Sequence, residues 1–257
     1  MDIAIRHLHA ALGGARVLHD LSLDLAGTRF IGLIGPNGVG KTTLVRALAG
    51  LIPFEGAITL DGAATNAMSP AIRAQRIAYL AQGGESHWPL TVERLVALGR
   101  LPHLGPFTAP QPADLAAIEN AMQLADVTAL RARDVLTLSG GERARALLAR
   151  ALAVEAPLLL VDEPVAALDP YHQLGVMEGL VAYAHAGRMV IAVLHDLSLA
   201  ARFCDELVLL NDGRVHAQGT AAQVLTPANL RDVYRIDADV TGEGRSMTIL
   251  PKSQMTT

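Results

Sequence analysis

The chain has 257 residues, a net charge of −4 and a mean hydropathy of +0.32, and it contains one cysteine, Cys204. The negative charge provides no basic field for nucleic acid, so we expect no nucleic-acid partner. A single cysteine excludes an internal disulfide and fits a reducing compartment. Because no run of about 18 apolar residues occurs and charges interrupt MDIAIRHLHA, we expect neither a membrane span nor a signal peptide, and hence a cytoplasmic protein.

The N-terminal stretch predicts a hairpin, followed by a strand, a loop and a helix. Residues 2–8 and 17–25 have the composition of strands, and Gly13-Gly14 between them is a turn signal. The apolar run FIGLIG at 30–35 predicts a buried strand, and the leucines of LVRALAGL at 44–51 have helical spacing. Further strands are expected over 56–61 and 77–82.

Between the buried strand and the helix lies GPNGVGKTT, which matches the phosphate-binding pattern G-x-x-x-x-G-K-[ST]. Gly38 and Gly40 let backbone N–H groups turn toward a phosphate, and the helix that begins near Lys41 adds the positive end of its dipole. We expect Lys41 to reach the β- and γ-phosphates and the Thr42 hydroxyl to bind Mg²⁺. The alternative, a glycine-rich turn that binds nothing, is disfavoured by the flanking strand and helix. The expected nucleotide-binding residues are Gly35, Pro36, Asn37, Gly38, Val39, Gly40, Lys41, Thr42 and Thr43.

The pattern changes after Gly83. Helices are expected over 91–100, with Thr91 as the N-cap, and over 112–125 and 140–154, and the proline-rich segment between the first two predicts a loop. An all-helical stretch inside an α/β pattern indicates an inserted subdomain, over about 84–155. The predicted fold class is therefore α/β: a P-loop NTPase core with an N-terminal antiparallel β subdomain and an inserted α-helical subdomain.

The α/β pattern resumes after the helices. A strand is expected at 157–164, a helix at 171–186, and strands at 189–196 and 206–213. A C-terminal extension covers about 214–257, where the sequence predicts a short strand, a helix broken at Thr226-Pro227, an edge strand at SMTIL and a frayed polar terminus.

Two carboxylates end the strand LLLVDEP. Parallel strands end at one edge of a sheet, so we expect Asp162 and Glu163 beside the glycine loop. Adjacent strand residues face opposite ways, which predicts Asp162 as a ligand of Mg²⁺ and Glu163 as the group that polarises the attacking water. Solvated acids at a strand end are the alternative. By the same strand-end reasoning, His195 faces the γ-phosphate and Gln82 senses Mg²⁺ or the water, although a lone histidine is usually structural.

The segment LSGGE at 138–142 has two interpretations that can hold together. Ser139 and Glu142 form S-x-x-E, a capping box for the helix that follows. Capping does not explain Gly140 and Gly141, whose N–H groups at a positive helix end form an anion site. The residues alone leave open whose phosphate this site binds. A solvated or paired face is expected for the arginines of this helix, Arg143, Arg145 and Arg150.

Taken in order, GPNGVGKTT, Gln82, LSGGE, LLLVDEP, the ALD that ends at Asp169, and His195 resemble the motifs of an ATP-binding-cassette (ABC) ATPase, over essentially the whole chain. LSGGE between a P-loop and an aspartate strand distinguishes this family from other P-loop NTPases. The resemblance implies ATP and Mg²⁺ as cofactors, with Asp169 also at the nucleotide site. It implies a head-to-tail pair of subunits, in which each ATP lies between one P-loop and the Ser139–Glu142 segment of the second copy.

Two segments resemble one branch of the family. VERLVALGRLPHLG at 92–105 and VLTPANLRDVYRIDADV at 224–240 are similar to parts of the ATPases of iron-chelate importers, a branch that also serves haem and cobalamin. The resemblance implies an ATPase that powers import of a siderophore-type chelate, with a periplasmic or extracellular substrate-binding protein as an indirect partner. The alternatives are haem or cobalamin import, and a soluble ABC ATPase without a permease. A small-molecule kinase does not explain LSGGE.

The chain departs from the family pattern at three positions. Leu12 stands where an aromatic residue usually stacks on adenine, Ala144 where glutamine is common, and Ala166 where serine is usual. We expect an apolar contact with adenine and weaker hydrogen bonding across the dimer, while the residues that carry the chemistry are all present.

The resemblance also implies that a polytopic membrane permease docks near Gln82–Leu98, which holds the protein on the inner face of the cell membrane. The only tryptophan, Trp88, lies in this stretch among glycine, serine and proline, which indicates an exposed loop. We expect Trp88, His87 and the Leu90–Leu98 face to line the docking groove. The alternative is a buried aromatic that anchors the helical subdomain.

Overall fold

The computed structural model describes residues 1–84, 88–105, 107–166 and 168–255. The chain forms two units, one made of Met1–Ala67 together with Ile191–Thr257, and the other of Met68–Val190. No helix within the described residues is long and apolar enough to cross a membrane.

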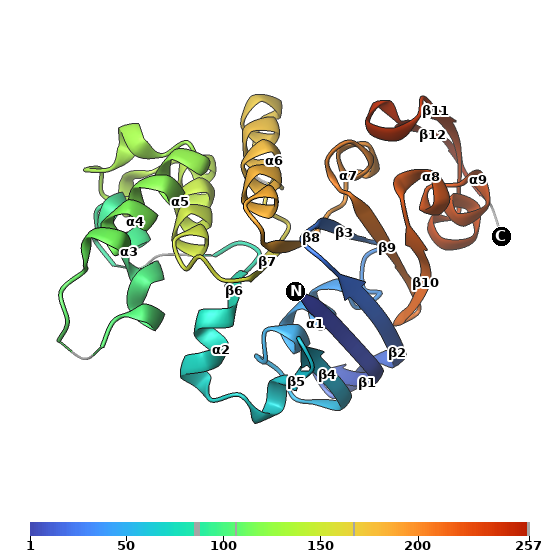
Figure 1. Ribbon diagram of the computed structural model, residues 1–257. Helices are drawn as coiled ribbons and strands as arrows, with labels where there is room; N and C mark the ends of the chain where they lie inside the picture. Colours follow the sequence, from blue (N-terminus) through green and yellow to red (C-terminus); the bar gives the residue numbers. More distant parts are fainter. Residues whose placement is uncertain (85–87, 106, 167, 256–257) are drawn as a thin grey trace. The chain divides into compact units, whose positions relative to one another are not determined.

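The first unit begins with an antiparallel sheet (Figure 1), in the strand order β2-β1-β4-β5. Its strands are β1 (Asp2–Leu12), β2 (Ala15–Ala26), β4 (Phe54–Leu60) and β5 (Ala63–Ala64). The predicted turn at Gly13-Gly14 is confirmed, and both glycines have positive φ. Ile3 lies opposite Leu25 and Ile5 opposite Leu23, so the buried alternate residues share one face.

Parallel pairing follows in the same unit. β3 (Phe30–Ile34), buried at every residue, pairs with β9 (Glu206–Asn211), and β9 pairs antiparallel with β10 (Arg214–Gly219). α1 (Lys41–Leu48) follows the glycine loop, and β8 (Met189–Val193) crosses the boundary between the units in sequence. The strand expected to reach residue 196 stops at Val193, because Asp196 caps the unpredicted helix α7 (Leu197–Phe203) by accepting a hydrogen bond from the Leu199 N–H at 2.8 Å.

The C-terminal segment completes the first unit. It contains α8 (Ala221–Val224), α9 (Pro227–Asn229), a π-helical turn over Leu230–Tyr234, and the hairpin of β11 (Ile236–Thr241) and β12 (Thr248–Gln254). The predicted break is confirmed, since Thr226 caps α9 by accepting from the Asn229 N–H at 3.2 Å. The expectation of a frayed terminus is wrong as far as Gln254, because β12 is paired with β11 and the Lys252 ammonium contacts the Asp239 carboxylate at 2.6 Å.

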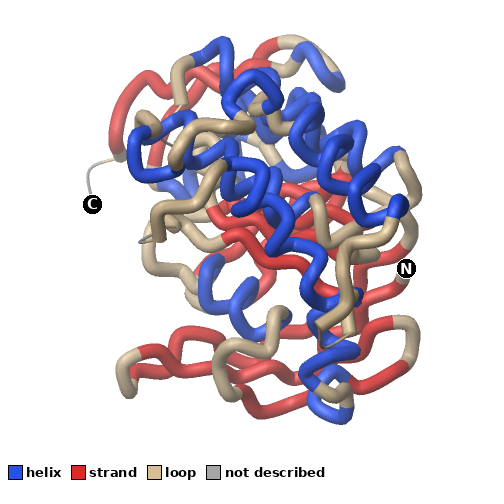
Figure 2. The backbone as a smooth tube through the Cα atoms, turned by 90° about the vertical axis from the view of Figure 1, so that its left-hand side faces the viewer, coloured by secondary structure: helices blue, strands red, loops and turns tan. Residues whose placement is uncertain are grey.

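The second unit combines two parallel strands with helices. β6 (Ile77–Leu80) pairs with β7 (Leu158–Asp162), and α3, α4 and α5 pack on one another (Figure 1). Figure 2 shows the backbone turned by 90°, with the helices in blue and the strands in red. The helices are α2 (Pro70–Arg76), α3 (Val92–Ala97), α4 (Pro112–Leu124), α5 (Gly140–Leu152) and α6 (Pro170–His185). The helix predicted over 91–100 starts as expected with Thr91 as its N-cap, but it becomes 3₁₀ over Leu98–His103.

Tertiary contacts explain this change of helix type. A Cβ at Gly99 would collide with the Arg150 carbonyl of α5, so only glycine allows the close approach. The next residue, Arg100, is buried and donates to the Asp114 carboxylate at 2.9 Å and to the Ala153 carbonyl at 2.8 Å. Burial of a charged side chain requires such partners, and they fix the backbone of this turn.

Candidate nucleotide site

The glycine loop lies in the first unit, between β3 and α1. Gly35, Gly38 and Gly40 all have φ between +82° and +145°, a region that glycine enters without a steric penalty. At Gly40 a Cβ would also lie 2.6 Å from the Leu18 side chain, and at Gly35 it would lie 2.5 Å from the Leu210 carbonyl oxygen. The loop therefore needs glycine for conformation at all three positions and for space at two.

Lys41, the first residue of α1, lies against this loop. Its side chain is only 6% exposed, and its ammonium donates hydrogen bonds to the carbonyls of Gly35 at 2.7 Å and Pro36 at 2.8 Å. The cation is therefore held at the start of the loop, where the first N–H groups of α1 also add positive potential. Thr42 follows in the first turn of the helix, and Thr43 is buried.

Three of the predicted residues come together in the second unit. Gln82, which follows β6, donates a hydrogen bond through Nε2 to Oε2 of Glu163 at 2.7 Å. Asp162, the last residue of β7, is 1% exposed. All three line a cavity of about 420 Å³. Glu163 lies beyond the end of the strand with φ of 53°, so the alternation rule that separated its direction from that of Asp162 does not extend to it.

The LSGGE segment contributes to the same cavity. The capping box is confirmed: the Ser139 hydroxyl accepts from the Glu142 N–H at 3.3 Å, and the Glu142 carboxylate accepts from the Ser139 N–H at 2.8 Å. This backbone hydrogen bond lowers the pKa of Glu142 below its ordinary value of 4.5. Gly140 and Arg143 line the cavity with Glu163. The helix start is thus both capped and presented toward the candidate base.

Asp169 and His195 lie at two other helix starts. Asp169 caps α6 by accepting from the His172 N–H, and its second oxygen lies 2.9 Å from His172 Nδ1. The backbone N–H, followed by the imidazole, lowers the pKa of Asp169. His195 is exposed and follows β8 in the first unit, directly before the cap of α7.

The residues predicted to hold Mg²⁺ have suitable donor chemistry. Asp162 and Gln82 provide carboxylate and amide oxygens in one cavity, and Mg²⁺ prefers oxygen ligands, usually one or two carboxylates together with phosphates and waters. Among the described residues no cluster of three or more histidine, cysteine or acidic side chains is arranged around a metal position. The structure brings two of the predicted ligands, Gln82 and Asp162, to one cavity, and the third, Thr42, lies in the first unit.

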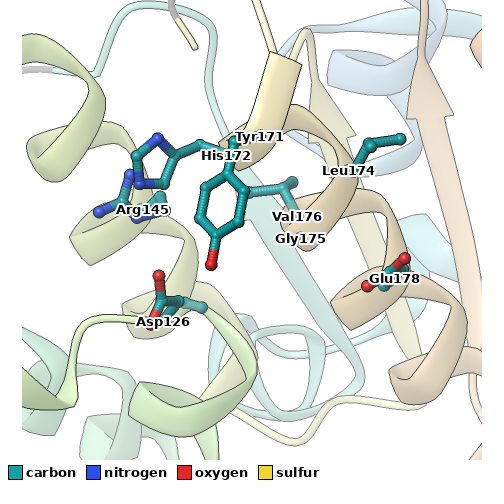
Figure 3. A pocket seen from close by; sticks show the side chains of 9 residues that line it. Asp126, Arg145, Tyr171, His172, Leu174, Gly175, Val176 and Glu178 are labelled. Atoms are coloured by element: carbon teal, nitrogen blue, oxygen red, sulfur yellow. The ribbon is translucent and has the colours of Figure 1, made fainter. Parts of the chain in front are cut away.

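Sequence reasoning missed a buried arginine. Arg145 is 7% exposed, and its Nε has no hydrogen-bond partner within the described structure. It lines a cavity of about 370 Å³ with Asp126, Tyr171 and His172 (Figure 3). The expectation of a solvated or paired face is therefore wrong at this position. Its spacing to the buried Leu148 and Leu152, three and seven residues on, was the available signal.

Comparison with known proteins agrees with this arrangement. Residues 18–166 match the family model described as "ABC transporter". A hemin import ATP-binding protein of Pseudomonas entomophila is 43% identical over 239 residues, which cover 91% of this chain and 92% of that protein. A cobalamin import ATP-binding protein of Halobacterium salinarum is also 43% identical, over 236 residues, but this chain spans only 59% of its length.

Solved structures show the same fold. A putative metal-chelate type ABC transporter in an inward-facing conformation matches with a TM-score of 0.81 and 25% identity, over 98% of this chain and 97% of that one. A dimeric ATP-binding cassette bound to ADP and Pi matches with a TM-score of 0.75 and 25% identity, over 85% and 98% of the two chains. On the matched residues, the extent of the relatives and the shared fold, this chain belongs to the ABC transporter family and contains its ATPase domain.

Proposed function

We propose that the chain is the ATP-binding and ATP-hydrolysing subunit of a membrane importer. The hydrogen bond between Gln82 and Glu163, in a cavity that Asp162 and Gly140 also line, is the observation that carries this proposal. The cavity brings together, within one unit, the Gln82 amide, the candidate general base Glu163, the carboxylate of Asp162 and the start of the LSGGE helix. A glycine-rich turn with no ligand would need none of these groups.

In this proposal the side chains have separate tasks. The loop Gly35–Thr43 and Lys41 bind the phosphate chain of ATP through N–H groups and the ammonium. Glu163 takes the proton of the attacking water, and Gln82 orients that carboxylate through its hydrogen bond. His195 donates to the γ-phosphate. Thr42, Gln82 and Asp162 hold Mg²⁺, which supplies charge neutralisation on the phosphates when it is bound.

The proposed working form is a head-to-tail dimer. Each ATP would lie between the glycine loop of one copy and the Ser139–Glu142 segment of the other, with Asp169 at the same nucleotide. Capping uses the side chains of Ser139 and Glu142 at one helix end, while the N–H groups of Gly140 and Gly141 are available for a phosphate. We treat 1–257 as one ABC ATPase domain, with about 84–155 as the inserted helical subdomain and about 214–257 as a C-terminal extension.

The proposed cargo is a metal chelate. The sequence favours a siderophore-type iron chelate, whereas the relatives named for hemin and cobalamin import support a tetrapyrrole-type chelate. We place the protein on the cytoplasmic face of the membrane, bound to a polytopic permease near Gln82–Leu98, with a periplasmic or extracellular substrate-binding protein as an indirect partner. Trp88 is 73% exposed in this stretch, which supports the docking role. His87, also expected in the groove, lies outside the described residues.

The test is co-expression and reconstitution with a candidate polytopic permease of the metal-chelate importer class. We expect co-purification of the two proteins, and ATP hydrolysis that rises when a binding protein loaded with hemin, cobalamin or a ferric siderophore is added. The Lys41→Ala variant is the control and should not hydrolyse ATP. Hydrolysis that is normal in Lys41→Ala would contradict the nucleotide site. Hydrolysis by a chain that binds no permease would favour the soluble ABC ATPase alternative.

A further inference from the structure

The helix α7 begins two residues after His195, the residue proposed to donate to the γ-phosphate. Directly before His195, the Leu194 N–H donates a hydrogen bond to the Leu33 carbonyl of β3 at 3.1 Å. Directly after it, Asp196 caps α7 by accepting from the Leu199 N–H at 2.8 Å. The backbone of His195 therefore lies between β3, which fixes the chain on one side, and the first turn of α7 on the other.

The first turn of α7 is held in turn by the C-terminal hairpin. The hydroxyl of Ser198, the second residue of the helix, accepts a hydrogen bond from the Ile249 N–H of β12 at 3.1 Å. Ile249 is buried, as is Met247, and α7 contacts both β12 and the 3₁₀ turn Gly244–Ser246. The hydrogen bond thus joins two segments that are 51 residues apart in the sequence but belong to the same unit.

The same hairpin contacts the chain beyond the other end of α7. The Arg245 guanidinium lies 3.8 Å from the carboxylate of Asp205, which follows the end of the helix by two residues. The second oxygen of Asp205 accepts from the Phe30 N–H of β3 at 2.9 Å. The turn that carries Arg245 is tightly built, because Gly242 has φ of 78° and a Cβ there would collide with the Ser246 carbonyl. The hairpin therefore contacts the chain at both ends of α7.

We propose that Ser198 is a positioning residue for ATP hydrolysis: through its hydrogen bond with β12, the C-terminal hairpin fixes the first turn of α7 and with it the direction of His195. A buried backbone N–H needs its acceptor, so a displacement of this turn would leave the Ile249 N–H unpaired. The C-terminal segment thereby takes part in arranging the site, although it carries no nucleotide motif. This inference rests on the proposed role of His195 at the γ-phosphate.

The test compares Ser198→Ala with Ser22→Ala. Ser22 is a matched control, because its hydroxyl also accepts a backbone N–H, that of His7 at 3.0 Å, in the antiparallel sheet of the same unit. We expect kcat for basal ATP hydrolysis to fall about 3- to 10-fold in Ser198→Ala, the range of one neutral hydrogen bond, and to stay unchanged in Ser22→Ala. Ser198→Thr keeps the hydroxyl and should restore the rate. The dissociation constant of MgADP, which has no γ-phosphate, should be the same in all these variants.

A double-substitution cycle with His195 separates positioning from stability. If Ser198 acts through His195, the kcat of His195→Ala should not fall further when Ser198→Ala is added, because the side chain that Ser198 positions is already absent. A merely structural serine would lower the melting temperature of Ser198→Ala and would reduce kcat by the same factor with and without the imidazole of His195.

The outcomes separate this inference from the proposed function. Wild-type kcat in Ser198→Ala, equal losses in Ser198→Ala and Ser22→Ala, or additive losses from Ser198→Ala and His195→Ala would overturn the role of Ser198 alone. Wild-type kcat in His195→Ala would overturn the proposed role of His195 and, with it, this inference. Hydrolysis at the wild-type rate in Lys41→Ala would instead overturn the nucleotide site itself.

Discussion

At the scale of single residues, the hydrogen bond from Gln82 to Glu163 connects two tasks of the proposed site. The Gln82 amide donates to one oxygen of the Glu163 carboxylate, the group that is proposed to accept a proton from water. Gln82 follows β6 and is the first residue of the stretch proposed for the permease, Gln82–Leu98. The proposed base is therefore hydrogen-bonded to the residue that begins the proposed docking stretch.

Substitution of the proposed base tests this assignment. Glu163→Gln keeps the size of the side chain but cannot accept a proton, so turnover should fall by roughly 10²–10⁴ while MgATP still binds. Binding titration and single-turnover hydrolysis measure the two effects separately. The variant should also accumulate as an ATP-bound dimer on gel filtration. Unchanged turnover would show that another group is the base.

A prediction at Cys204 tests the burial of its thiol rather than the chemistry of the proposed site. Burial raises the pKa of its thiol, and a Cβ on Gly32 would lie 2.9 Å from its sulfur. Because the thiolate is the reactive form, we expect no reaction with a disulfide reagent under native conditions and complete reaction in urea. Fast labelling of the folded chain would contradict the packing of α7 against β3.

At the scale of elements, the sequence predicted those with a strong periodic or apolar pattern. The buried strand β3, the hairpin of β1 and β2 and the capping box of α5 all follow from local signals. α2 was missed because none of its residues is buried, so it has no apolar stripe. α7 was missed because its apolar residues continue those of β8, although Asp196 was a readable cap signal. The 3₁₀ turn after α3 depends on contacts with α4 and α5, which no local pattern encodes.

The ion pair between Arg100, in this 3₁₀ turn, and Asp114 leads to a prediction about how the stability of the fold depends on pH. The Gln111 N–H, followed by Arg100, holds the pKa of Asp114 below its ordinary value of 3.8. A carboxyl whose folded pKa is depressed stabilises the fold fully above its unfolded pKa, and this contribution is lost as the pH falls through the folded value. Arg100→Ala should therefore lower the melting temperature clearly at pH 7 and less as the pH is lowered below about 4. Arg94→Ala, at an exposed position on α3, is the control and should change little at any pH. A pH-independent effect of Arg100→Ala would contradict the ion pair.

One substitution at the start of α5 distinguishes its two interpretations, a capping box alone and a capping box that also binds a phosphate. Aspartate caps a helix as well as serine does, so Ser139→Asp should preserve the melting temperature. If the segment also faces a γ-phosphate across a dimer, the added negative charge should repel ATP and abolish hydrolysis. Thermal unfolding and hydrolysis assays on the same sample measure both effects. Normal hydrolysis in Ser139→Asp would leave the segment as a capping box only.

At the scale of the whole molecule, the prediction of the site was most complete where the chemistry is carried by motif residues. Gln82, Asp162 and Glu163 were each named from strand ends, and the structure brings them to one cavity. The hydrogen bond between Gln82 and Glu163 was not predictable, because Glu163 leaves the strand geometry with a positive φ. Long-range contacts, unlike motif chemistry, require the fold.

The last prediction concerns the permease and rests on Trp88. Its 73% exposure is opposite to what an anchor of the helical subdomain requires, and large exposed aromatic residues on loops are typical centres of interfaces. Trp88→Ala should weaken assembly with the permease by about 2 kcal/mol or more, the scale of an interface hot spot, and leave basal ATP hydrolysis unchanged. The fluorescence of this single tryptophan should shift when the wild-type complex forms. Phe107→Ala is the matched control, because Phe107 is also fully exposed on a loop of the same unit but lies outside the proposed stretch. Equal weakening by both substitutions, or complex formation that is unaffected by Trp88→Ala, would place the docking surface elsewhere on the molecule.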